Sequence, residues 1–398
     1  MAVTVAIANP SIPELLSYCR TIAAQQQEAL HRAATYGSVE DLPFDIEDFM
    51  PSAERTPELL AFLRGQKIHV DDPNRRRFTP RSAVQGLPPI AADKICHRQI
   101  AGAIRARFPK VMVIGEEASE ADWEEAMNAD PGTVIVDVDP IDGSLPFDTL
   151  GCGYSTNFVI YRRALGTYHG VATLAHLVVS SSGRDLLFVS PNAVTVGHRG
   201  DHLVPRSDFQ CTPEDVRPGT VAVVGTQGKH RRGGPSVLFD TELSWGLPPY
   251  ESGGRTYYDP PLTCVGLGGA PFFVEMILMR LETIVIPHAQ TVHDAAGLPA
   301  LLALGAHCFD FDGNPITMES LMAAFTVLGP PNSEIYTPIP GMVISRNESL
   351  GRLIAERVGH ADSVGMRLRA VEDSDQKPPF YIVEDDKDDE NDEKGETA

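Results

Sequence analysis

Three aspartates lie within six residues at the end of an apolar run, in the stretch GTVIVDVDPIDGS (132–144). Two of them, Asp139 and Asp142, flank Pro140 and Ile141, and a residue before proline favours an extended backbone. A strand that ends at Asp139 therefore directs two carboxylates, together with a backbone carbonyl, toward one point. Such hard oxygen ligands suit a cation such as Mg²⁺.

The next two residues favour an anion site beside this cation site. Gly143 allows an unusual turn or a close backbone approach, and Ser144 is a good N-cap for a helix whose first turn tolerates Pro146. Backbone N–H groups at a helix start bind anions, so the stretch suits a phosphate held by a metal. The alternative interpretation is an ordinary Asp-Gly turn capped by its own aspartates.

Other carboxylates also stand at the ends of predicted elements. Glu116 and Glu117 follow the predicted strand KVMVIG, and Asp93 lies near the start of a predicted helix. Asp294, in VHDAAG, begins a strongly apolar stretch, where it is expected to cap a helix. Each of these carboxylates also has a simpler interpretation. The glutamates would lie in a solvated loop, and the two aspartates would cap helices.

In this order, the acidic segments resemble those of the inositol monophosphatase and fructose-bisphosphatase superfamily, whose members are magnesium-dependent and often lithium-sensitive phosphatases. The matching segments are Asp93 at a helix start, GEE at 115–117, DPIDGS at 139–144 and HDAAG at 293–297. The resemblance covers roughly residues 89–325 and includes the first helix, but not residues 36–88 or the C-terminal tail.

The resemblance implies a site for two or three Mg²⁺ ions. It implies that one ion is held by Glu116, Asp139 and the Ile141 carbonyl, and a second by Asp139, Asp142 and Asp294. A third, weaker site is expected near Glu116 and Glu117. Two such ions lower the pKa of an attacking water and stabilise the leaving alkoxide.

The same resemblance gives roles to residues that touch water or substrate. Ser144 and Glu116 are expected to orient the attacking water, and Asp93 is expected to assist through solvent on the metal. Asp142 and the backbone N–H groups of Gly143 and Ser144 are expected to hold the phosphate. Arg255 is a further candidate for a substrate contact, although an exposed arginine is the simpler interpretation.

Four departures from the family pattern bear on specificity. Leu145 and Pro146 replace the polar residues that usually follow the DPIDGS segment, and His293 replaces a tryptophan, so this histidine either packs or faces the substrate. Pro299 indicates that the helix after Asp294 starts late or kinks. Residues 284–292 contain no carboxylate, which argues against myo-inositol phosphate as the substrate.

The elements that must position these residues form a mixed pattern. Helical periodicity covers residues 11–34 and the segment from Ala92 to Phe108, and residues 295–306 are apolar enough for a buried helix. Strands are expected at 133–139, 154–162, 170–180, 185–190, 193–198 and 219–226. This mixture predicts a layered α/β or α+β fold. The resemblance implies an alternating α-β-α-β-α sandwich.

We expect an N-terminal part over residues 1–185 with most metal ligands, and a C-terminal part over 186–373 that contributes Asp294. Residues 36–88 are expected to be an insertion or loop. Residues 374–398 are expected to be a disordered acidic tail, or else a docking tail, because residues 384–398 hold nine acidic residues and two lysines.

Composition restricts the class of protein. The chain has 398 residues, of which 42% are hydrophobic, and it has no apolar run of roughly 18 residues that could span a membrane. A net charge of −21 disfavours nucleic acid and anionic membranes as partners. Six cysteines without C-x-x-C spacing, and a start without signal-peptide features, favour a cytoplasmic protein with reduced thiols.

The sequence therefore predicts a magnesium-dependent phosphomonoesterase for a small sugar, polyol or nucleotide phosphate. The resemblance allows a homodimer as its assembly. One alternative is a bisphosphate phosphatase of the fructose-1,6-bisphosphatase or 3′(2′),5′-bisphosphate nucleotidase type, with residues 229–232 as the second anion site. Another is a non-catalytic regulator that keeps the fold. The intact carboxylate set opposes this last alternative, since converging like charge is costly without cations.

Overall fold

The computed structural model describes residues 10–36, 91–143, 153–164, 169–189, 193–197, 209, 220–224, 250–252, 255–257, 263–267, 270–278, 280–286, 290–329 and 339–359. The predicted insertion at 36–88, beyond its first residue, and the predicted tail at 374–398 lie outside these ranges. So do Ser144, Leu145, Pro146 and the basic residues 229–232.

The first sheet has the order β1-β2-β3-β4-β5-β6, with β1 and β2 parallel and the remaining pairs antiparallel. Its strands are β1 (Met112–Ile114), β2 (Val134–Asp142), β3 (Ser155–Arg163), β4 (Val171–Ser180), β5 (Arg184–Val189) and β6 (Ala193–Gly197). The domain boundary expected at residue 185 thus falls within β5, and the sheet continues to Gly197.

Both faces of this sheet are covered, as the alternation along β2 requires. Val134, Val136 and Val138 pack with α1 (Ile12–Tyr36) and α3 (Ala91–Arg107) in one core. Ile135, on the opposite face, packs in a second core with the short helices α7 (Pro271–Ile277) and α8 (Leu298–Leu304). Asp137 and Asp139 follow the same alternation, so they belong to the face of α7 and α8. A further helix, α4 (Glu120–Met127), contacts β1.

The second sheet lies beyond α7 and α8 and has the order β10-β7-β11-β13-β12. Its strands are β7 (Thr220–Val224), β10 (Thr263–Leu267), β11 (Thr283–Ile286), β12 (His307–Phe309) and β13 (Met342–Ser345). A helix over 348–359 packs on its outer side, where Arg352 stacks on Phe309. The remaining elements are α9 (Met318–Ala324) and the hairpin of β8 (Tyr250–Ser252) and β9 (Arg255–Tyr257).

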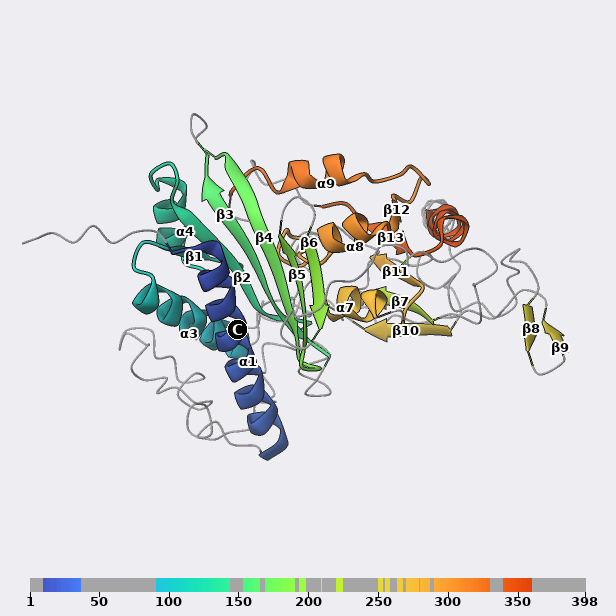
Figure 1. Ribbon diagram of the computed structural model, residues 1–398, viewed down its shortest axis with the longest axis horizontal. Helices are drawn as coiled ribbons and strands as arrows, with labels where there is room; N and C mark the ends of the chain where they lie inside the picture. The colour runs from blue at the N-terminus through green and yellow to red at the C-terminus, as the bar shows by residue number, and fades with distance from the viewer. Residues whose placement is uncertain are drawn as a thin grey trace, which may run out of the picture.

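Figure 1 shows the resulting order of layers, from α1 and α3 through the first sheet, α7 and α8, and the second sheet to the outer helix. The predicted α/β fold with alternating α-β-α-β-α layers is therefore confirmed. Within the described part of the chain, no helix combines the length and apolar character that crossing a bilayer requires.

Candidate metal centre

A bulge in β2 gathers the aspartates of the opening stretch on one face of the sheet. Asp139 pairs with Asn157 but Asp142 pairs with Ser155, so β2 has one more residue than β3 between these pairs. In a regular strand, residues three apart point to opposite faces, and the extra residue brings Asp142 back to the face of Asp139. The strand thus continues to Asp142, and the prediction that it ends at Asp139 was wrong.

The bulge is held by its own polar groups. The N–H of Ile141 donates to Oδ1 of Asp139 at 3.0 Å, and the Thr156 hydroxyl donates to the carbonyl of Pro140 at 2.9 Å. Proline is tolerated here because a bulge needs no ladder donor at that residue. Gly143 follows with φ of +96°, the left-handed backbone that its sequence position indicated.

Glu116 and Glu117 follow β1, which runs parallel to β2, so their carboxylates lie at the same edge of the sheet as Asp139. Asp93 is buried in the first turn of α3. Burial, followed by the nearby carboxylates of Asp93 and Glu117, raises the pKa of the Cys96 thiol well above its usual range. Asp93 and Glu117 therefore both lie near Cys96.

Asp294 reaches this edge from a turn between the two sheets. The alternative interpretation of Asp294 as a helix cap is not observed, because α8 begins only at Leu298 with Pro299 in its first turn. The Thr291 N–H donates to Oδ2 of Asp294 and the Asp294 N–H donates to the Thr291 hydroxyl, both at 3.3 Å. These reciprocal bonds leave Oδ1 of Asp294 facing the ring of His293, whose Nε2 is 3.8 Å away.

His293 lies at the centre of the cluster, with only 1% of its surface exposed. Its Nδ1 is 3.4 Å from Oδ1 of Asp137, and its Nε2 is 3.8 Å from Asp294 Oδ1 and 4.0 Å from Glu116 Oε2. One atom each of Asp139, His293 and Asp294 lie within 4.8 Å of one another. The ring of His293 therefore lies among carboxylates, and its expected contact with the substrate stays a prediction.

Asn157, which the sequence analysis did not single out, connects the two halves of the site. Its side-chain amide donates to Asp142 Oδ2 at 2.8 Å and to the carbonyl of His293 at 3.2 Å. The N–H of Ala270, at the start of α7, also donates to Asp142 Oδ2. Only the register of β2 and β3 places Asn157 here, and that register cannot be read from local sequence.

Removing this connection should destabilise the fold. Asn157→Ala deletes three buried hydrogen bonds: the two that its amide donates, one of them to a carboxylate, and the one that its Oδ1 accepts from the Ser155 hydroxyl at 2.9 Å. The free energy of unfolding should fall by about 3–4 kcal/mol. Urea denaturation measures this loss. Thr173→Ala is the control, since it removes one neutral bond, to the carbonyl of Phe325 at 2.9 Å, and should cost about 1 kcal/mol. Equal losses would show that Asn157 does not connect the site.

Electrostatics identify the cluster as a place for cations. Burial and Asp142 raise the pKa of Asp139 well above its usual range, and burial and Asp294 raise the pKa of Asp142 to about 7. Partial burial and Glu117 raise the pKa of Glu116 to about 8. Burial lowers the pKa of His293, but Asp137 and the other aspartates raise it further, so the net shift is upward. An oxygen-rich set with this mutual repulsion fits divalent cations.

These shifts predict how metal-free protein responds to pH. The pKa of Asp142 rises from 3.8 and those of Glu116 and Glu117 from 4.5, to between about 7 and 8. Each carboxyl therefore stabilises the fold below its unfolded pKa, and this stabilisation is lost as the pH rises through the folded value. His97 and His176, whose pKa values burial lowers from 6.5, act in the opposite sense below pH 6.5.

With chelator present, the melting temperature should therefore fall between pH 6.5 and about 8. Saturating divalent cation should remove that fall, because the cation favours the ionised carboxylates. Differential scanning calorimetry at several pH values tests this, with Asp142→Asn expected to reduce the slope. A slope that is unchanged by cation would contradict the assignment of the cluster.

Some predicted site residues are not placed in the cluster. Arg255 belongs to β9, in a hairpin that Figure 1 shows at the far edge of the molecule from β2. Ser144, the expected partner of Glu116, lies outside the described residues. The described backbone includes Ile141, but the role of its carbonyl as a ligand stays a prediction.

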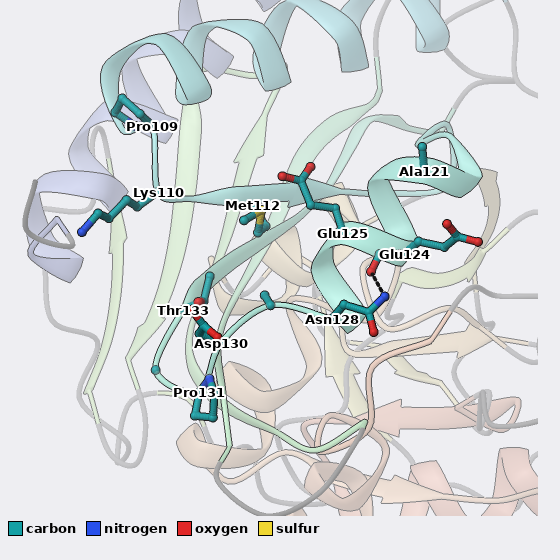
Figure 2. A pocket seen from close by; sticks show the side chains of 12 residues that line it. Pro109, Lys110, Met112, Ala121, Glu124, Glu125, Asn128, Asp130, Pro131 and Thr133 are labelled. Atoms are coloured by element: carbon teal, nitrogen blue, oxygen red, sulfur yellow. Dashed lines mark hydrogen bonds between the residues drawn. The ribbon is translucent and has the colours of Figure 1, made fainter.

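A surface hollow lies at the ends of β1 and β2 where these strands begin, away from the carboxylates at their other ends, as Figure 2 shows. It is bordered by Met112 and Thr133, which precede or begin these strands, and by Glu124, Glu125 and Asn128 of the α4 region. The amide of Asn128 donates to the carbonyl of Glu124 at 2.9 Å within this wall. The hollow therefore does not belong to the carboxylate cluster.

Compared by sequence, the chain matches no family model and no curated protein. Compared by structure, it is similar to solved proteins over most of its length. Among the solved structures that it resembles are three inositol monophosphatases.

Three of these structures show the extent of the likeness. Inositol monophosphatase II from Staphylococcus aureus is 14% identical, with 72% of this chain and 87% of that chain covered and a TM-score of 0.44. The enzyme from Zymomonas mobilis is 12% identical, with 86% and 99% covered and a TM-score of 0.45. That from Thermotoga maritima is 13% identical, with 74% and 91% covered and a TM-score of 0.45. At these identities and TM-scores, the likeness carries no function over to this chain.

Proposed function

We propose that the protein is a phosphatase that hydrolyses the phosphate monoester of a small sugar, polyol or nucleotide with the help of bound Mg²⁺ or a similar cation. The observation that carries the proposal is the convergence of Asp139, His293 and Asp294 within 4.8 Å, at the edge where Glu116 also lies. The DPIDGS segment that contributes Asp139 is the most specific motif in the chain.

The residues present fit divalent cations. Asp139, Asp142, Asp294, Glu116 and Glu117 supply carboxylate oxygens, and Oε2 of Glu117 is buried without a hydrogen-bond partner among the described residues. Cations bound there would polarise a phosphate ester and lower the pKa of water. They would also explain how a protein with a net charge of −21 binds an anion.

Glu116 is suited to move the proton of an attacking water. Its side chain is 37% exposed, so solvent reaches it, whereas Asp139 and Asp142 are buried. A carboxylate that solvent reaches, and that bound cations keep ionised, can accept the proton of such a water. The turn at Gly143, with φ of +96°, begins the segment whose backbone N–H groups are proposed to hold the phosphate.

The test is phosphate release from a panel of sugar, polyol and nucleotide phosphates, with bisphosphates included, in Mg²⁺ and in chelator. The proposal expects release that depends on the cation, and the best substrate then distinguishes monophosphate from bisphosphate specificity. Lithium added to the same assay tests the expected sensitivity. If the folded protein bound cation but released no phosphate from any ester, the non-catalytic alternative would replace the proposal.

A further inference from the structure

The ring of His293 is buried and directed into the carboxylate cluster. With 1% of its surface exposed, it exchanges no hydrogen bond with bulk water. Its Nε2 has no hydrogen-bond partner among the described residues, since Asp294 Oδ1 at 3.8 Å and Glu116 Oε2 at 4.0 Å are too distant. A buried ring nitrogen without a partner is costly, so a further group is expected between Nε2 and these oxygens.

The distances suit a cation between these atoms. Donors of one ion are separated by at most twice the bond length, about 4.2 Å for bonds of about 2.1 Å. The separations of Nε2 from Asp294 Oδ1 (3.8 Å) and Glu116 Oε2 (4.0 Å) are within this limit. The largest separation in the set of Asp139, His293 and Asp294, at most 4.8 Å, closes with a small side-chain rotation.

The other ring nitrogen is oriented by Asp137. Nδ1 lies 3.4 Å from Asp137 Oδ1, and both residues are buried. A ligating histidine usually directs its second nitrogen at a carboxylate or carbonyl, which fixes the tautomer and the ring orientation. The amide of Asn157, which donates to the His293 carbonyl at 3.2 Å, holds the backbone of the same residue. Asp137 and Asn157 thus position His293 from two sides.

We propose that His293 is itself a metal ligand, binding one divalent cation through Nε2 together with Asp139 and Asp294, with Asp137 as the outer partner of Nδ1. The inference rests on the proposed function for the location of the cations and extends it to the kind of cation. Imidazole suits Zn²⁺ and other transition metals, whereas Mg²⁺ prefers oxygen ligands. This position therefore binds Zn²⁺, Co²⁺ or Mn²⁺ more tightly than Mg²⁺.

Calorimetric titration of the full, chelator-treated chain with Zn²⁺ and, separately, Mg²⁺ tests the inference. Zn²⁺ should bind more tightly than Mg²⁺ to the natural sequence. His293→Gln should weaken Zn²⁺ binding by at least about 100-fold, and Asp137→Asn, which keeps the imidazole, by about 10–100-fold. His307→Gln is the matched control, because His307 lies on β12 in the second sheet, and it should leave both affinities unchanged.

A spectroscopic measurement identifies the ligand directly. In the Co²⁺ protein, proton NMR should show one paramagnetically shifted, exchangeable ring N–H signal, which is that of Nδ1, and this signal should be absent from His293→Gln. Circular dichroism confirms that each variant is folded, and Asp137→Asn supplies the test if His293→Gln does not fold.

Two outcomes would overturn the inference, namely Zn²⁺ binding that is equal in the natural chain and in both cluster variants, or Mg²⁺ binding tighter than Zn²⁺. Either can occur while Mg²⁺-dependent phosphate release persists, in which case the proposed function stands alone. Conversely, Zn²⁺ binding that depends on His293 without phosphate release from any ester would support the ligand and contradict the phosphatase.

Discussion

Replacing Asp139 with asparagine should lower phosphate release by at least about 1,000-fold, a larger effect than the 10–100-fold loss typical of an outer-shell partner of a metal. A ligand atom of Asp139 lies within 4.8 Å of those of His293 and Asp294, and Asp139 is expected to contact two ions. An amide is neutral and binds cations more weakly, so the variant should lose both cation affinity and turnover. Initial rates across a series of Mg²⁺ concentrations measure the loss.

The variant should nevertheless fold. An asparagine carbonyl can still accept the N–H of Ile141, which donates to Asp139 Oδ1 at 3.0 Å, so the bulge persists. Burial and Asp142 raise the pKa of Asp139, which means that its charge opposes folding at neutral pH without cation. The metal-free variant should therefore melt above the metal-free natural chain. Asp130→Asn, at an exposed aspartate after α4, should change neither quantity.

Replacing Gly115 with alanine should produce the second large effect, a loss of about 3 kcal/mol in the free energy of unfolding. A Cβ at this position would lie 2.2 Å from the carbonyl oxygen of Val138 and 2.9 Å from Cε1 of His97. Backbone of β2 would have to move, and Val138 directly precedes Asp139. A displacement of this kind beside the reacting groups should also lower turnover by about 100-fold.

Gly132→Ala provides the comparison, because it changes backbone conformation without creating a contact. Gly132 has φ of +87°, and a Cβ there would meet no atom within 4 Å. The left-handed conformation should cost about 1 kcal/mol, with activity unchanged. Urea denaturation compares the stability of the two variants, and phosphate-release rates compare their activity. If Gly115→Ala were as active and as stable as Gly132→Ala, the close approach of β1 and β2 would not be needed to form the site.

Much of the fold could be predicted because burial imposes periodicity on each element. The apolar residues Val134, Val136 and Val138 indicated a strand, and the first predicted helix, over 11–34, is observed at Ile12–Tyr36. The acidic motifs could be found because their residues are consecutive or nearly so in the chain. Pro299 likewise indicated the late start of α8, which begins at Leu298.

What the sequence could not reveal depends on register and on turns between distant segments. The bulge that aligns Asp142 with Asp139 is defined only by their pairing with β3, and so is the position of Asn157. Asp137 precedes Asp139 by two residues, a spacing that places both side chains on one face of a strand. Nothing in the local sequence, however, connects Asp137 with His293. That contact forms only because the turn before α8 reaches the edge of the first sheet.

If this carboxylate cluster binds the cations on which turnover depends, cation binding and turnover must rise together. The chelator-treated full chain is titrated with Mg²⁺ and with Mn²⁺, and cation binding by calorimetry and phosphate release are followed on the same preparation. At least one cation should bind, and phosphate release should rise along the same saturation curve. A folded protein that binds neither cation, or one that releases phosphate equally well in chelator, would contradict this role of the cluster.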